Sequence, residues 1–75
     1  MQELLEFIAK SMVNHPEAVT VTVTEKESAT VLELRVAEED MGKVIGKQGR
    51  IAKAIRTVMK AAASNESKRV VVDIM

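Results

Sequence analysis

The sequence is poor in the residues that usually stabilise very small proteins. Its 75 residues include no cysteine, tryptophan or tyrosine, one phenylalanine, one proline, one histidine and three glycines. Without cysteine there is no disulfide, and the single histidine, His15, provides too few ligands for a structural metal. Stability must therefore come from regular packing of helices and strands, or from self-association.

Long apolar runs and catalytic constellations are lacking as well. No run approaches the ~20 apolar residues of a membrane span, and the early acids Glu3 and Glu6 differ from the basic leader of a secretory signal. His15 has no serine, cysteine or carboxylate pair at a spacing that suggests catalysis, so it is interpreted as a surface or capping residue. We therefore predict one soluble, cytoplasmic domain over residues 1–75, with no enzymatic activity, no cofactor and no metal.

Charge is balanced in number but not in position. Residues 1–40 hold nine acids and three bases (−6), whereas residues 41–75 hold eight bases and two acids (+6). Residues 41–60 contain six bases and no acid. Since a local field extends only about a Debye length of ~8 Å, distant acids do not cancel it, and an anionic partner is indicated. The alternative is a solvated helix face that is merely basic; the acids of the first half are interpreted mainly as solubility charge.

Hydrophobic periodicity predicts the elements of the first half. Apolar residues at helical spacing predict a helix over residues 2–14, which Pro16 ends, with Phe7 packed inside the protein. Strict alternation of valine with threonine predicts a strand over 19–25, and a second alternation predicts another over 30–36. The short link between them favours a hairpin.

The second half predicts two helices and a last strand. A short helix over 38–45 begins with Glu38, Glu39 and Asp40, where the helix dipole favours acids, and ends at Gly46. A helix over 50–63 has an apolar face and stops near Asn65. Residues 70–74 form a mostly buried strand. The apolar residues of the second helix face are Ile51, Ile55, Val58, Met59 and Ala62, and the methionines Met41, Met59 and Met75 are expected to fill the packing.

This order of elements predicts an α+β fold. The first two strands pair antiparallel, and the two helices form a right-handed crossover that places the last strand parallel to its neighbour. The result is a three-stranded mixed sheet with helices on one face. Such a small domain with a valine-rich last strand leaves an edge or apolar face that a second copy could cover, which favours dimerisation.

The segment Gly46-Lys47-Gln48-Gly49 between the two helices is the strongest functional signal. Gly46 permits positive φ and a tight reversal, while Gly49 leaves the backbone bare where the next helix begins. Free N–H groups at a helix N-terminus attract anions, and Lys47 and Gln48 add a charge and hydrogen-bonding groups at the tip. The residues therefore predict a loop that holds the phosphates of a single strand.

Other loops share parts of this pattern. Glycines that serve only a corner between helices would produce the same short motif. A Walker phosphate loop is excluded, because Gly42 to Gly46 is one residue too short and Gln48 stands where a Ser or Thr should bind magnesium. A DNA-reading helix-turn-helix is disfavoured, since strands flank the helix pair.

The run Val44-Ile45-Gly46-Lys47-Gln48-Gly49-Arg50-Ile51 is similar to the signature of KH domains, whose Gly-x-x-Gly loop clamps about four single-stranded nucleotides. The element order resembles the type II KH arrangement. The length, the lead-in 37–43, the run 49–56 and the closing valines resemble the small bacterial KhpA family over essentially the whole chain.

That resemblance implies a non-catalytic RNA chaperone or regulator, linked to cell elongation and division. It implies a homodimer, or pairing with a larger KH-containing RNA-binding protein, and the alternative function is a dimerisation adaptor for such a partner.

The family motif also assigns site residues. It makes Gly46, Lys47, Gln48 and Gly49 the backbone clamp, with Ile45 and Ile51 as apolar braces that help to form the base groove. Ile45 and Ile51 are nevertheless expected to be core residues first of all, as is Val44. Closeness to the loop adds four cations by electrostatics: Lys43, Arg50, Lys53 and Arg56.

Overall fold

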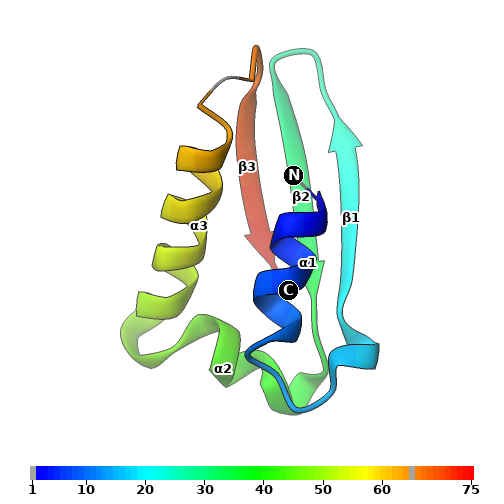
Figure 1. Ribbon diagram of the computed structural model, residues 1–75, viewed down its shortest axis with the longest axis vertical. Coiled ribbons are helices and arrows are strands. Elements are labelled where there is room, and N and C mark those ends of the chain that lie inside the picture. The colour runs from blue at the N-terminus through cyan, green and yellow to red at the C-terminus, as the bar shows by residue number, and fades with distance from the viewer. Residues whose placement is uncertain (1, 65) are drawn as a thin grey trace.

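Helices and strands follow each other in the predicted order. The fold is taken from a computed structural model, and residues 2–64 and 66–75 are described. Figure 1 shows the regular elements, which are α1 (Gln2–Lys10), β1 (Thr20–Glu25), β2 (Ala29–Arg35), α2 (Met41–Ile45), α3 (Arg50–Ala62) and β3 (Arg69–Ile74). Short 3₁₀ turns cover Pro16–Ala18, Glu38–Asp40 and Lys47–Gly49. The predicted stop at Asn65 lies outside the described residues.

The sheet has the predicted mixed topology. Its strand order is β1-β2-β3. β1 runs antiparallel to β2, with Val21 opposite Leu34, and β2 runs parallel to β3, with Leu32 opposite Val72. Figure 1 shows α1 lying over β2 and running roughly along the strands, with α3 beside β3. The α2–α3 turn lies at the end opposite the β1–β2 hairpin tip. The predicted α+β fold is confirmed.

The core lies between one face of the sheet and the two longer helices. Alternate strand residues point to this face because side chains in a strand alternate with period two. They meet the buried stripes of α1 and α3 in one cluster, which consists of Leu5, Ala9, Val19, Val21, Leu32, Leu34, Ile55, Met59 and Val72. Leu5, Leu34 and Met59 are fully buried. Truncating one of these side chains to alanine should cost about 2–5 kcal/mol, a large share of the stability of a small domain.

The first helix differs from its prediction in two ways. It ends at Lys10 rather than at residue 14, because the backbone beyond it is drawn into bonds with Asp40 instead of continuing the helix. Phe7 was predicted to be packed, and this is wrong: 72% of the residue is exposed. Leu5 and Ala9 form the buried stripe of α1, and Phe7 lies two positions, or about 200°, around the helix from Leu5.

The last helix and strand bury less than their sequences predicted. In α3 the buried stripe is Ala52, Ile55 and Met59, whereas Ile51, Val58 and Ala62 of the predicted apolar face are exposed. In β3 only Val72 is buried, and the other valines and Ile74 are half-buried. The reason is position, since β3 is an edge strand and α3 lies beside it at the margin of the sheet.

Asp40 has a role different from the predicted one. The carboxylate was expected to be solubility charge in the first turn of a helix, but the residue is fully buried. Its oxygens accept the backbone N–H groups of Asn14 (3.2 Å) and His15 (3.0 Å). Predicted helix 38–45 accordingly divides into the 3₁₀ turn Glu38–Asp40 and the five-residue helix α2.

Candidate nucleic-acid interface

The turn between α2 and α3, here called the glycine loop (Gly46–Gly49), is built from left-handed backbone. Gly46 has φ 75° and ψ 175°, Gln48 has φ 58°, and Gly49 has φ 74°. The N–H of Gly46 closes α2 on the carbonyl of Gly42 at 2.9 Å, and the N–H of Gly49 donates to the carbonyl of Gly46 at 3.1 Å. Glycine adopts such angles without a steric cost, whereas Gln48 adopts them at a cost.

Gly46 is required for a second reason, which is the close approach of Ile51. A Cβ at position 46 would lie 2.6 Å from Cγ1 of Ile51, closer than real Cβ contacts allow. Ile51 therefore packs on the loop, as the predicted brace would. Ile45 and Ile51 were first of all predicted to be core residues, yet more than a third of each is exposed, and only Val44 is fully buried. The braces thus present apolar surface beside the loop.

No side chain caps the backbone N–H groups at the start of α3. Gly49 occupies the N-cap position and makes no side-chain hydrogen bond to the helix. The first-turn N–H groups of a helix have no partners within the helix, and together with the helix dipole they favour an anion. Lys47, Gln48 and Arg50 surround this end and are exposed. An anion such as phosphate is the kind of ligand that this arrangement favours.

The cations around the loop have no carboxylate partner in the part of the chain that the structure describes. All six bases of residues 41–60 are exposed, and none forms an ion pair with another described residue. Of the bases in the second half, Lys68 alone has an ion-pair partner within residues 2–64 and 66–75, the carboxylate of Glu25 at 3.7 Å. Unpaired exposed cations keep their full field for an external anion.

The structure separates the predicted basic stripe into two parts. Arg56 projects toward the sheet, where its Nε donates to the carbonyl of Val72 at 3.2 Å. Lys53 and Lys60 lie three residues before and four residues after Arg56, so the three form one row, here called the β3-side row. Arg50 is not part of it, because it lines a hollow on the α1 side of α3 with Ile8 and Met12.

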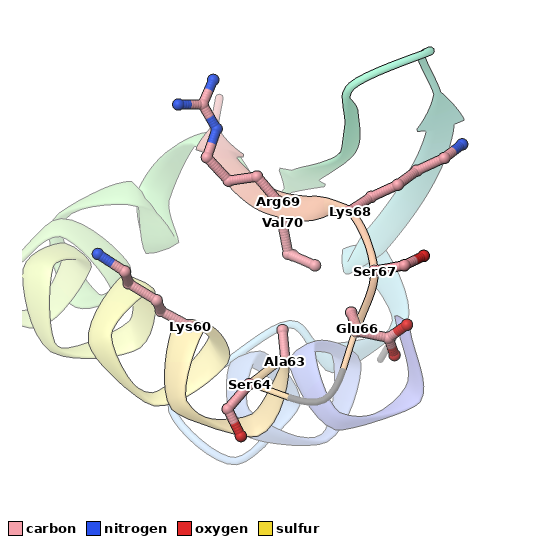
Figure 2. A pocket seen from close by; sticks show the side chains of 8 residues that line it. All are labelled: Lys60, Ala63, Ser64, Glu66, Ser67, Lys68, Arg69 and Val70. Carbon is pink, nitrogen blue, oxygen red and sulfur yellow. The ribbon is translucent and has the colours of Figure 1, made fainter.

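A groove runs between α3 and β3. It has a volume of about 460 Å³ and is lined by Arg56, Lys60 and Arg69 together with residues 70–73 of the strand. A second hollow, of about 490 Å³, continues it past Lys60 and Val70 toward the chain between α3 and β3. Figure 2 shows Ala63 and Val70 pointing toward each other across this hollow, with Lys60 and Arg69 on one side and Lys68 on the other. We name the continuous depression the α3–β3 groove.

The groove residues that were absent from the predicted site include the cations Lys60 and Arg69. Lys60 could have been included from sequence, because it follows Arg56 by four residues on the same helix. No local signal marks Arg69. It reaches the groove because the parallel pairing of β3 with β2 brings the start of β3 alongside the end of α3.

The described part of the chain offers no candidate for two other kinds of site. No group of three or more His, Cys, Asp or Glu residues within it could hold a metal ion. Across residues 2–64 and 66–75, no helix is both long and apolar enough to cross a membrane.

The sequence and this geometry agree with one known family. Residues 2–74 match the family described as KhpA/KhpB, KH domain. The chain belongs to this family. It is 65% identical over all 75 residues to the "RNA-binding protein KhpA" of Clostridium acetobutylicum and 57% identical over the same length to the protein of that name from Caldanaerobacter subterraneus, and in both cases the whole of each chain is covered. These relatives are RNA-binding proteins of a non-enzymatic family, so the prediction that the chain is not an enzyme is confirmed.

The fold is also found in larger proteins of low sequence similarity. The chain resembles part of Aquifex aeolicus Era bound to GDP·AlF4⁻, with a TM-score of 0.70 and 18% identity over 97% of this chain and 28% of that one. A structure of Era in complex with MgGDPNP and nucleotides 1506–1542 of 16S ribosomal RNA gives a TM-score of 0.63, with the same identity and coverage. The order α-β-β-α-α-β that was predicted from the sequence is the order observed.

Proposed function

We propose that the protein is a single KH domain that binds single-stranded RNA with the glycine loop and the adjoining α3–β3 groove. The observation that carries the proposal is the conjunction of an uncapped helix start with exposed cations on and beside α3 that pair with no described carboxylate. The names of the relatives support it, since they are RNA-binding proteins, as does the Era complex with ribosomal RNA. The family resemblance suggests a role for the protein: it would act in the cytoplasm as an RNA chaperone or regulator and would affect cell elongation.

The glycine loop and the α3–β3 groove would contact different parts of the RNA. Gly46 and Gly49 would let the RNA backbone approach, and Lys47 and Gln48 would contact its phosphates. Lys43, Arg50 and Lys53 would add electrostatic attraction around the loop. Bases would turn toward the valines that line the groove, while Ile45 and Ile51 would brace the loop. Since the chain has no tryptophan or tyrosine and its phenylalanine lies on α1, base stacking on aromatic rings would contribute little.

The test of the loop is a charge change confined to its tip. Replacing Lys47 and Gln48 together with Asp should abolish binding to a short single strand, because the net charge falls by about three units where phosphate should lie. Binding is measured by fluorescence anisotropy over a salt titration, with circular dichroism to show that the fold is retained. Unaltered binding by this variant would rule out the loop assignment.

A matched control is available at the other end of the molecule. Lys26 and Ser28 are exposed in the β1–β2 hairpin, and replacing both with Asp makes the same change in net charge. This variant should bind RNA nearly as well as the unmodified protein. If both double variants lose affinity equally, the loss is not specific to the glycine loop and the loop assignment fails.

A second role, as a dimerisation module or adaptor, is favoured by an apolar row on the other side of α3. Ile51, Ala54 and Val58 are all exposed there, with 48% of Val58 accessible, and they line a hollow with Ile8 and Met12 of the α1 side. We call these three the α1-side row. A second copy of the chain is the proposed occupant, and a KH domain of a larger RNA-binding protein would present a similar surface. The two roles are separable, because the Asp pair in the glycine loop should leave self-association intact.

A further inference from the structure

The buried carboxylate of Asp40 lies outside both proposed binding surfaces. Among the described residues it is the only charged or polar side chain that is buried, with an exposed fraction of 0%. Burial of a carboxylate is costly unless its oxygens accept hydrogen bonds. Both oxygens of Asp40 do so: Oδ1 accepts from the N–H of Asn14 and Oδ2 from the N–H of His15.

These bonds tie together two distant segments of the chain. The connection after α1 is joined to the residue that precedes α2, across sequence separations of 26 and 25 residues. The side chain of His15, 44% of which is exposed, spans the same junction, with Nε2 3.3 Å from the Glu39 carboxylate. Asp40 occupies the N-cap position of α2, but its side chain makes no capping bond to that helix. Its carboxylate accepts hydrogen bonds only from the connection after α1.

The element that follows Asp40 is too short to hold itself in place. α2 has five residues, far fewer than the ~12–15 at which an isolated helix becomes even marginally stable. Its position must be fixed at its ends and by packing. The C-terminal end is fixed by Gly46 and its close approach to Ile51, and Val44 is packed in between. The N-terminal end is fixed by the Asp40 bonds.

We infer that Asp40 is a positioning residue for the glycine loop: its two hydrogen bonds hold α2 in the orientation that presents Lys47 and Gln48 to RNA. The role rests on the RNA binding proposed above, and it adds a residue that touches no RNA. Weakening the bonds should let α2 leave its docked position in part of the population. If the docked state falls to about a tenth, the apparent dissociation constant for RNA rises about tenfold.

The test compares Asp40→Asn with Val21→Ala, a core variant in β1 that is remote from the loop. Asn replaces one acceptor by a donor that faces a backbone N–H, so one bond is removed while the volume is kept. Both variants are destabilised, and RNA binding is measured at a temperature where denaturant titration shows both to be fully folded. We expect a roughly tenfold weaker affinity for Asp40→Asn and an unchanged affinity for Val21→Ala. Equal affinities in the two variants would overturn the inference.

A second measurement does not depend on RNA. Amide hydrogen exchange followed by NMR should show faster exchange at residues 42–49 in Asp40→Asn, with the strand amides exchanging as they do in Val21→Ala. Faster loop exchange without any RNA binding by the unmodified protein would sustain the positioning and refute the proposed function. Unchanged loop exchange would refute the positioning itself.

If Asp40→Asn does not fold, His15→Ala provides the same readout. The His15 side chain is partly exposed, so removing it takes away the outer interaction of the junction and leaves the core intact. Exchange of the loop amides should then rise to a smaller extent, and no rise at all would contradict the inference.

Discussion

The two sides of α3 differ in chemistry although they belong to the same 13 residues. The β3-side row is basic, borders a groove and is joined to the edge strand through Arg56 and Val72. The α1-side row is apolar and exposed, with the charged residue Arg50 at its end. Around a helix, residues three, four and seven apart share a face, so one short helix can carry both rows without mixing them.

This separation would let the two proposed partners, an RNA strand and a second copy of the chain, be bound at the same time. An anionic strand in the α3–β3 groove would leave Ile51 and Val58 uncovered, and a second copy on the α1-side row would leave Arg56 and Lys60 free. With no aromatic stacking beside the loop, affinity for RNA in one domain should be modest. Two loops in one dimer would then raise the overall affinity through effective concentration, provided that both can reach the same strand.

Among changes to the two sides of α3, the largest effect should come from reversing charge in the β3-side row. Replacing Arg56 and Lys60 with Glu should weaken RNA binding by about 100-fold or more at low salt. It should also flatten the slope of log K against log salt by about 1.4, which is 0.7 for each phosphate of a single strand that the protein no longer neutralises. Anisotropy titrations at several salt concentrations measure both quantities.

The control for this variant carries the same charge change elsewhere. Lys10 and Arg35 are exposed and line neither part of the groove, and replacing both with Glu should change the salt slope little. Sedimentation of the Arg56/Lys60 variant should show the same self-association as the unmodified protein. Loss of self-association would mean that the two sides of α3 are not independent.

An intermediate effect should follow from a charge in the α1-side row. Val58→Asp should abolish the proposed self-association, because a carboxylate would have to be buried unpaired in an apolar interface. The affinity for a long single strand should fall about tenfold as avidity is lost, while the affinity for a strand that fills one groove should be retained. Analytical ultracentrifugation gives the oligomeric state, and Val58→Ile, which stays apolar, should remain dimeric. A Val58→Asp protein that is still a dimer would place the interface elsewhere.

The smallest effect on stability and RNA affinity should come from the glycine loop, which joins α2 to α3. Gln48 has a left-handed backbone, and Gln48→Gly should raise the free energy of unfolding by up to about 1 kcal/mol, since the steric cost exceeds the extra entropy that glycine loses on folding. Urea denaturation measures this change, and Gln48→Ala, which keeps the unfavourable angle, is the control. RNA affinity should change by less than a factor of about three, because Lys47 and the backbone donors remain. A less stable glycine variant would indicate that the Gln48 side chain stabilises the loop.

Much of the fold could be predicted because its signals are local. The alternation of valine and threonine fixes which side of β1 is buried, and Gly46 and Gly49 mark a turn that needs left-handed backbone at both positions. The order of elements then restricts the sheet to one topology. The loop itself could be predicted for the same reason, since Lys47 and Gln48 are bounded by the glycines that shape it.

The features that could not be predicted depend on which distant segments of the chain come into contact. Phe7 and Leu5 are both apolar residues of α1, and only the direction from which the sheet approaches determines that Leu5 is buried and Phe7 exposed. Asp40 looked like an ordinary first-turn acid because its partners, the N–H groups of Asn14 and His15, are 26 and 25 residues away. Arg69 enters the groove only through the pairing of β3 with β2.

The sequence by itself determined the family, the mixed sheet and a glycine loop within a basic segment, because periodicity, turn residues and charge act over a few neighbouring residues. Only the tertiary structure decided that the basic segment divides between two sides of α3, that a groove with Lys60 and Arg69 lies beside the basic side, and that Asp40 ties the loop's short helix to the connection after α1. Those facts follow from packing and pairing between segments far apart in the chain, and residue spacing alone does not reveal them.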